Sequence, residues 1–169
     1  MIITLLLFGN GYCDTAEEHI NQGITYQRTG NIEGALNEYS KALELNPKLY
    51  QGYNFRGIIY AMKGKEYLDL AITDFDKALQ INPNYAEAYF SRGLAYKYKE
   101  NLDEAISNFN KAIEIKPDFI DAYNQRAGAY FKKGLYDRSW DDIHKMESLG
   151  SKVNPSFLEK LKQASQKIK

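Results

Sequence analysis

Apolar residues between positions 86 and 117 recur at the three- and four-residue spacing of two consecutive amphipathic helices. In the first predicted helix, Gly93 stands between two large residues, Tyr89 and Tyr96, and in the second Phe109 stands between two alanines. The small residues let the helices approach closely, and the rings fill the space beside the contact. One outer apolar face stays uncovered, so this pair requires a similar unit on each side.

The chain supplies those neighbouring units, because the pattern recurs with a period of about 34 residues. In each unit a small residue is followed by a tyrosine three positions later, and the small residues are Gly23, Gly57, Gly93 and Ala127. The second helices of the first three units carry an alanine, an aromatic residue and another alanine. A proline then follows, and these prolines are Pro47, Pro83 and Pro117. The sequence therefore predicts a solenoid of stacked helix pairs.

These recurring positions resemble the tetratricopeptide repeat family over residues 16–153. The resemblance implies an all-α fold, a right-handed superhelical solenoid of antiparallel helix pairs. We expect one solenoid domain at 14–153, with four repeats at 16–49, 50–85, 86–119 and 120–153. The last repeat is degenerate, and a capping helix is expected at 154–169.

Several residues mark helix ends. Thr15 and Glu18 form a capping-box pattern at the start of the first helix, and Gly30 suits the left-handed conformation at its end. The residue before a proline avoids the helical region, so each repeat proline predicts a stop. Two extra residues lie in the turn of the second repeat, within KEYLDL. This insertion is either a tolerated surface turn or a contact, and exposure of Tyr67 and Leu68 would favour the contact.

An arginine precedes the small residue in three of the first helices, at Arg56, Arg92 and Arg126. The position before the apolar residue of the second helix holds the matching polar residues Asp74, Asn108 and Asp142. We interpret each pair as a clamp within one repeat, because a half-buried arginine is seldom left unpaired. The alternative is a track of three stacked arginines that binds an anion.

The end of the chain departs from the repeat pattern. In the fourth repeat Ser139 replaces the alanine and Ile143 the aromatic residue, as is common in terminal repeats. The following segment, NPSFLEKLKQASQKIK, places its apolar residues on one stripe and its lysines opposite. We expect this segment to cover the open end of the stack, the alternative being a helix that lies on a membrane surface.

Residues 1–13 form a separate apolar N-terminal segment. The apolar run at 2–8 is too short for a membrane-spanning helix, which needs about 20 residues. It is the remnant of an export signal, an apolar segment of the mature protein, or a lipid-attachment segment ending at Cys13. A single cysteine excludes an intramolecular disulfide, so the cysteine count does not indicate the redox compartment. Two locations therefore stay open, the cytoplasm and, after export, the periplasm or another extracytoplasmic compartment.

The charge balance and the short sequence motifs restrict the function classes that are expected for this chain. Lysine plus arginine and aspartate plus glutamate both number 22, so no net field attracts nucleic acid or an anionic membrane. The histidines, His19 and His144, lie in different terminal repeats, and no metal-binding motif, phosphate loop or nucleophile elbow is present. The sequence predicts neither an enzyme nor a metal or other cofactor.

The resemblance also implies a binding surface, because the first helices of tetratricopeptide repeats line the inside of the superhelix and hold a peptide. Counted from the matched small residues, the expected groove residues are Ile20, Ile24, Arg28, Asn54, Phe55, Ile58, Met62, Phe90, Leu94, Lys97, Tyr98, Asn124, Gln125 and Phe131. The residues expected in an apolar floor are Ile24, Ile58, Leu94 and Phe90. Asn54 and Asn124 are expected as partners of a peptide backbone. Alternatively, some of the aliphatic residues pack between neighbouring repeats.

We therefore expect a non-catalytic protein-interaction module whose partner is a protein or peptide with apolar anchors, with no nucleic acid and no integral membrane span. The family members that hold the C-terminal tails of chaperones carry a lysine and an asparagine one turn apart in a first helix. Ile20 and Ile24 occupy that turn here, so this clamp is missing. The alternatives are a self-associating scaffold, and hence a homo-oligomer, or an exported periplasmic or membrane-attached assembly factor.

Overall fold

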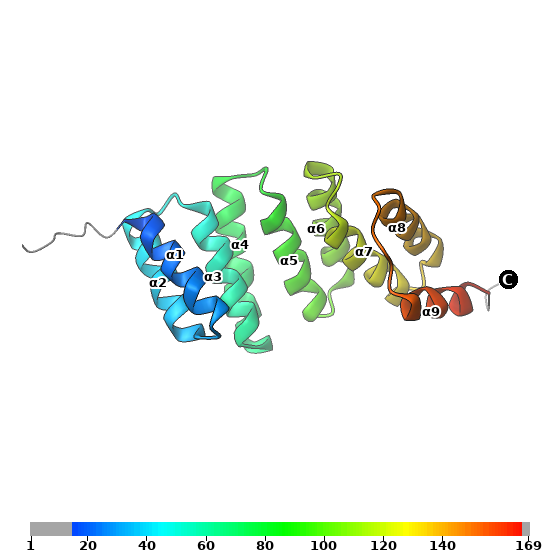
Figure 1. The fold of residues 1–169 in the computed structure, drawn as a ribbon, viewed down its shortest axis with the longest axis horizontal. Coiled ribbons are helices and arrows are strands. Elements are labelled where there is room, and N and C mark those ends of the chain that lie inside the picture. The colour runs from blue at the N-terminus through cyan, green and yellow to red at the C-terminus, as the bar shows by residue number, and fades with distance from the viewer. Residues whose placement is uncertain (1–14, 167–169) are drawn as a thin grey trace, which may run out of the picture.

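The structure is a computed structural model that describes residues 15–166, and it shows a row of stacked helices (Figure 1). The proposals for residues 1–13, including lipidation of Cys13, lie outside the described residues. The helices between residues 15 and 166 are α1 (Ala16–Arg28), α2 (Ile32–Leu45), α3 (Tyr50–Lys63), the 3-10 helix η1 (Lys65–Tyr67), α4 (Leu68–Ile81), α5 (Ala86–Tyr98), α6 (Leu102–Ile115), α7 (Ile120–Lys132), α8 (Tyr136–Ser148) and α9 (Pro155–Gln166). No strand occurs in this range, which confirms the all-α solenoid.

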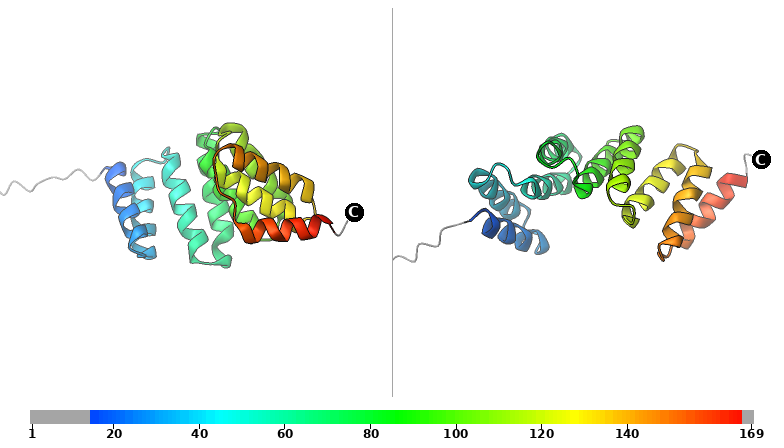
Figure 2. Two further views of the ribbon diagram at one scale, coloured as in Figure 1. Left: turned by 45° about the vertical axis from the view of Figure 1, so that its right-hand side comes forward. Right: turned by 90° about the horizontal axis from the view of Figure 1, so that it is seen from above.

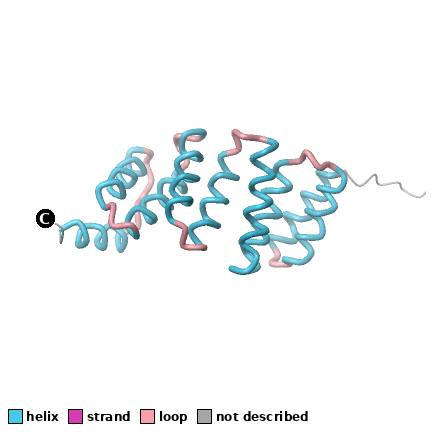
Figure 3. The backbone as a smooth tube through the Cα atoms, turned by 180° about the vertical axis from the view of Figure 1, so that it is seen from behind, coloured by secondary structure: helices cyan, strands magenta, loops and turns pink. Residues whose placement is uncertain are grey.

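The helices are arranged as successive antiparallel pairs, α1 with α2, α3 with α4, α5 with α6 and α7 with α8, as two turned views show (Figure 2). The second helix of each pair contacts the first helix of the next. First helices of successive pairs also touch, α3 with α5 and α5 with α7, so they form one continuous face. Seen from behind, most connecting loops lie along the two edges of the row, and the segment between α8 and α9 crosses from one edge to the other (Figure 3).

The helix ends confirm the sequence predictions. The Thr15 side chain accepts a hydrogen bond from the Glu18 backbone, and the Glu18 side chain accepts one from the Thr15 backbone, completing the capping box. Gly30 follows α1 with a φ of 76°, which an L side chain rarely adopts. The helices α2, α4 and α6 each end two residues before a proline, at Leu45, Ile81 and Ile115.

Within each of the first three pairs, a glycine lies against a buried aromatic ring. A Cβ atom added at Gly93 would lie 2.6 Å from the Phe109 ring, and one at Gly57 would lie 2.7 Å from the Phe75 ring. Both rings are almost fully buried, so they have no room to retreat. The absence of a side chain at these glycines is what allows the paired helices to approach closely.

In the fourth pair, different residues lie at the positions where the two helices pack together. Ala127 takes the glycine position, and the smaller Ile143 takes the place of the ring. Ser139 is fully buried in the position of the alanine, and its hydroxyl donates a 2.9 Å hydrogen bond to the Ala127 carbonyl. The fourth repeat is therefore a compensated variant, because the larger first-helix residue accompanies a smaller second-helix residue.

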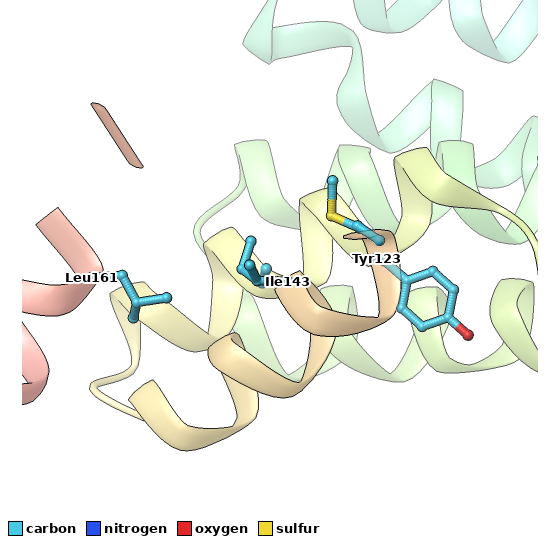
Figure 4. Close-up of a cluster of buried hydrophobic side chains, with 5 residues drawn as sticks. Tyr123, Ile143 and Leu161 are labelled. Atoms are coloured by element: carbon cyan, nitrogen blue, oxygen red, sulfur yellow. The ribbon is translucent and has the colours of Figure 1, made fainter. Parts of the chain in front are cut away.

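Helix α9 packs on the end of the stack. Leu161 on α9 is fully buried in a cluster with Ile143 and Tyr123 of the last pair, and Ile143 lies between the other two (Figure 4). The Phe131 and Phe157 rings meet edge to face at 5.5 Å, and the Trp140 indole N–H donates to the Ser165 hydroxyl at 3.1 Å. These contacts support the proposed capping role of the segment.

The arginine clamps are confirmed. Arg56 donates two hydrogen bonds to Asp74, Arg126 donates two to Asp142, and Arg92 donates one of 2.8 Å to the Asn108 side-chain oxygen. The hydrogen bond to Asp74 raises the pKa of the Arg56 guanidinium. Each arginine also reaches the second helix of the preceding pair, where its partners are Ser40, Asp76 and Asn110 respectively. Their donors are thus used within the protein, which speaks against an anion track.

In the first pair a different group meets the matching carboxylate. Gln22 takes the arginine position in this pair, and it is exposed. Glu38, at the position that matches Asp74, lies 2.6 Å from Nδ1 of His19 and accepts a 2.9 Å hydrogen bond from Lys41. Burial raises the pKa of the Glu38 carboxyl, and the hydrogen bonds from Lys41 and His19 lower it. The lowering effects together outweigh the effect of burial, so the pKa lies below its ordinary value of 4.5. This cluster was not anticipated, because His19 lies one turn from the arginine position.

Candidate functional site

The continuous face of first helices contains a pocket between α3 and α5, which we call the apolar pocket. Its volume is about 360 Å³, and its lining residues are Ile58, Ala61, Met62, Gly64, Lys65, Leu68, Phe75, Ser91, Leu94, Ala95 and Tyr98. The lining has one charged side chain and a largely aliphatic and aromatic floor. Met62 and Tyr98 remain exposed at its edge, with exposures of 54% and 67%. Large apolar side chains left uncovered beside a pocket are typical of binding sites.

The two-residue insertion contributes to this pocket. It folds as η1 and brings Gly64 and Lys65 to the pocket, while Leu68 begins α4 and is buried at its floor. Tyr67 is half-buried, with the Lys63 ammonium 4.8 Å from the centre of its ring. Exposure of Tyr67 and Leu68 was expected to favour a contact, and neither is exposed. The insertion instead contributes lining residues to the apolar pocket.

A second pocket, which we call the polar pocket, lies between α5, α7 and α9. Its volume is about 380 Å³, and its lining residues are Lys97, Asn124, Gln125, Gly128, Asn154, Ser156, Phe157 and Lys160. The Lys97 ammonium donates a 2.6 Å hydrogen bond to the Gln125 side-chain oxygen. Burial and the nearby charge of Lys132 lower the pKa of the Lys97 amine.

Seven of the fourteen groove residues named from the sequence line these two pockets. Ile58, Met62, Leu94 and Tyr98 meet at the apolar pocket, and Lys97, Asn124 and Gln125 meet at the polar pocket. Helix α5 contributes to both sets, with Tyr98 in the apolar pocket and Lys97 in the polar pocket.

The other seven residues lie elsewhere, and most pack against aromatic rings of the stack. Ile20, Ile24 and Phe55 cover the cluster around Tyr39, where the Phe55 ring stacks on the Tyr39 ring at 5.6 Å. The Phe90 ring packs against the Phe109 and Phe119 rings, and the Phe131 ring packs against the Tyr136 and Phe157 rings. Phe55 therefore covers the preceding repeat, in agreement with the alternative of inter-repeat packing, whereas Phe90 packs within its own repeat and Phe131 packs within its own repeat and on α9. Arg28 is exposed at the end of α1 and belongs to neither pocket.

Asn54 differs from its expected role as an exposed partner of a peptide backbone. It is only 3% exposed, and its side-chain nitrogen lies 3.4 Å from the Tyr85 hydroxyl. Its side-chain oxygen is buried without a hydrogen-bond partner. The reason is that Tyr85, at the start of the third pair, closes over this turn of α3, where its ring also packs on Tyr50.

Sequence reasoning missed the residues that reach the pockets from outside the first helices. Lys65 and Leu68 come from the insertion, and Asn154, Ser156, Phe157 and Lys160 come from α9 or the turn before it. The insertion was visible as two extra residues, so part of the signal was present. For α9 the sequence showed only an amphipathic helix, which does not reveal that its edge completes a pocket.

The described part of the chain offers neither a metal centre nor a membrane-spanning helix. Between residues 15 and 166, histidine, cysteine, aspartate and glutamate do not gather into a group that could hold a metal ion. In the same range, no helix combines the length and apolar character needed to cross a membrane.

The stacked pairs and the pocketed inner face define a helical-repeat protein, and comparison with known families identifies the kind. A tetratricopeptide repeat model matches residues 16–49, and a TPR repeat model matches residues 66–99 and 93–134. The chain therefore belongs to the tetratricopeptide repeat family, whose members generally act as non-catalytic scaffolds. It is a protein-interaction module. No curated protein matches its sequence.

Solved structures share the fold. A crystal structure of MamA is 31% identical, with a TM-score of 0.72 over 80% of this chain and 78% of that one. A thermophilic TPR protein of Thermus thermophilus, TTC0263, is 21% identical, with a TM-score of 0.73 over 89% and 81% of the two chains. The first TPR of Spaghetti (RPAP3), bound to an HSP90 peptide, is 23% identical, with a TM-score of 0.66 over 69% and 91%. The last two similarities concern the fold alone.

Proposed function

We propose that this protein is a non-catalytic module that holds a peptide segment of a partner along the face of its first helices, with an apolar side chain of the peptide in the apolar pocket. The observation that carries the proposal is the pocket itself, where the half-buried Ile58 and Leu94 lie beside the exposed Met62 and Tyr98. A cavity of about 360 Å³ suits one large apolar side chain with its neighbouring backbone.

The electrostatics of the apolar pocket favour an uncharged anchor. Lys65 is its single charged lining residue, and its side chain is exposed. A charged peptide side chain would lose hydration in this pocket without meeting a partner on its floor, whereas a leucine, methionine or phenylalanine would bury apolar surface.

Selection from a displayed random peptide library tests the proposal even though the partner is unidentified. The wild-type chain is expected to enrich peptides with large apolar residues, and Ile58→Asp with Leu94→Asp is expected to abolish that enrichment. Leu70→Asp is the matched control, because Leu70 is 49% exposed on α4 and does not line the pocket. Circular dichroism establishes that each variant is folded.

Tyr98→Asp provides a second route, because an exposed edge residue can be changed without disturbing the core. It is expected to weaken every peptide selected through the apolar pocket. Retained binding by both pocket variants, with the helical signal intact, would show that the apolar pocket is not the site.

Self-association through the same surface would give a different result in solution. A second copy seated in the pocket would make the mass concentration-dependent, whereas a module for an external peptide stays monomeric. Sedimentation at two protein concentrations distinguishes these outcomes, and we expect a monomer at both.

A further inference from the structure

The polar pocket carries an unbalanced charge. Its lining includes two ammonium groups, those of Lys97 and Lys160, and no carboxylate. The charge of Lys132 is close enough to affect the Lys97 amine. The other lining side chains are the neutral Asn124, Gln125, Asn154, Ser156 and Phe157. The pocket is therefore positive although the whole chain has no net charge.

Lys97 is the exception among the half-buried basic residues of the described range. The other five are Arg56, Lys63, Arg92, Lys99 and Arg126, and each lies beside a carboxylate of the protein. Lys97 has only the neutral oxygen of Gln125. A partly buried ammonium without a carboxylate loses hydration and gains no ion pair, so this position is unfavourable for the free protein.

The pocket is also kept open beside this amine. Gly128 on α7 has no side chain, and a Cβ atom placed there would lie 3.8 Å from Nζ of Lys97, with no other heavy atom within 4 Å. A glycine in the middle of a helix lowers helix stability relative to alanine. Gly128 is thus a second residue at this position of the fold that lowers the stability of the free protein, after Lys97, whose ammonium has no carboxylate partner.

We propose that the polar pocket binds the side-chain carboxylate of an aspartate or glutamate in the same peptide whose apolar residue occupies the apolar pocket. This inference rests on the proposed function. The two pockets lie on the two sides of α5, because Tyr98 lines the pocket shared with α3 and Lys97 lines the pocket shared with α7. Along the row, α7 lies between α5 and α9, so a peptide that continues from the apolar pocket toward α9 passes Lys97 and then Lys160 (Figure 1).

A side-chain carboxylate fits this position better than a chain terminus. A terminal carboxylate would require the peptide to end at this pocket, whereas a side chain reaches it from a peptide that continues. Asn124, Gln125 and Ser156 supply neutral hydrogen-bond donors to an acceptor held between the ammonium groups.

Two substitutions remove the site by independent means, and each has a matched control. Lys97→Met deletes the charge and keeps the apolar stem, with Lys97→Arg as the variant that retains the charge. Gly128→Asp supplies a carboxylate from the protein itself next to Nζ of Lys97, with Gly128→Ala as the variant that adds only a methyl group. Neither position lines the apolar pocket.

The full chain and these four variants are each challenged with a random dodecapeptide library displayed through its C-termini, so that aspartate and glutamate side chains are the only carboxylates. We expect peptides with an apolar residue and an acidic residue from the wild type, Lys97→Arg and Gly128→Ala. From Lys97→Met and Gly128→Asp we expect apolar peptides without the acidic residue. In a selected peptide made with an amidated C-terminus, exchange of glutamate for glutamine should weaken binding to the wild type about tenfold, and binding to Lys97→Met very little.

The outcomes separate the two proposals. Apolar enrichment by the wild type without an acidic residue, or an acidic preference that survives in Lys97→Met and Gly128→Asp, overturns the inference and leaves the proposed function standing. Enrichment of no peptide by the wild type overturns both. Equal binding of a peptide whose only carboxylate is its free C-terminus would also overturn the side-chain assignment.

Discussion

The Arg56 guanidinium and the Asp74 carboxylate are joined by two parallel hydrogen bonds of 2.8 Å, which tie α3 to α4. A third bond, of 3.3 Å, runs from Arg56 to the Ser40 hydroxyl on α2. One side chain therefore connects three consecutive helices. In the next pair Arg92 makes the same connections, but its partner within the pair is the neutral Asn108 and its partner in the preceding helix is the exposed Asp76.

This difference predicts unequal costs for removing the two arginines. Arg56→Met leaves a buried carboxylate without a partner and should lower the free energy of unfolding by about 2–3 kcal/mol. Arg92→Met leaves a neutral amide and an exposed carboxylate, neither of them a buried charge, and should cost about 1 kcal/mol. Urea denaturation of both variants measures the difference. Equal losses would mean that the charge of Asp74 is not what makes the clamp important.

The close approach of paired helices predicts that adding one methyl group at Gly93 is harmful. Its Cβ atom would meet the fully buried Phe109 ring, and overpacking of this kind costs about 1–3 kcal/mol, against a gain of about 1 kcal/mol in helix propensity. Gly93→Ala should therefore destabilise the protein. Gly128→Ala is the control, since its Cβ atom would make only an ordinary van der Waals contact, 3.8 Å from Nζ of Lys97, and the change should stabilise by about 0.5–1 kcal/mol. Thermal unfolding of the two variants should shift in opposite directions.

The position of α9 predicts a local effect at the end of the stack. Leu161→Ala removes a fully buried side chain and should cost about 2–4 kcal/mol, whereas the half-buried Leu158 should cost less on the same change. Because each repeat contacts only its neighbours, amide exchange should accelerate in α8 far more than in α2. Uniform acceleration along the chain would argue against a capping role.

The Lys97 ammonium, which has no carboxylate partner, predicts that a residue of the polar pocket can be replaced with a gain in stability. Lys97→Met should raise the free energy of unfolding of the free protein by roughly 0.5–1 kcal/mol, because it removes a half-buried charge without a carboxylate. Lys99→Met, whose ammonium pairs with Asp69, should bring no such gain. Urea denaturation at neutral pH compares them. A loss of stability in Lys97→Met would show that the hydrogen bond to Gln125 outweighs the burial of the charge.

The lowered pKa of Glu38 predicts an acid-dependent contribution to stability. The folded pKa lies below the unfolded value near 4.5, so the contribution is fully present above that pH and is lost as the pH falls through the folded pKa. The wild type should therefore be more stable than Glu38→Gln at pH 6, and the difference should shrink as the pH falls below 4.5. Denaturation across this range measures it, and a constant difference would contradict the assignment.

Short-range regularities in the sequence identified the stack. Gly57 and Gly93, the rings that face them, and the prolines after the second helices recur in register, and their roles are local. A helix pair that hides one apolar face and exposes another has few arrangements open to it besides stacking on copies of itself. The arginine clamps were predictable for the same reason, because both partners lie within one repeat.

The two pockets were predicted only in part. The register placed Ile58, Leu94 and Lys97 on the inner face, but it placed Phe55 and Phe90 there equally. Which of these residues is covered depends on contacts with other helices and loops, and no spacing within a single helix contains that information. The ion pairs between successive repeats, such as Lys63 with Glu33, were missed for the same reason.

The sequence by itself thus determined the helix pairs, their order and the face formed by the first helices, because these follow from periodicity and from the need to bury apolar stripes. Only the tertiary structure decided where that face stays open. The insertion after α3 and the edge of α9 complete the two pockets from segments outside the repeat pattern. Their positions follow from packing between elements distant in the chain, which local residue spacing does not specify.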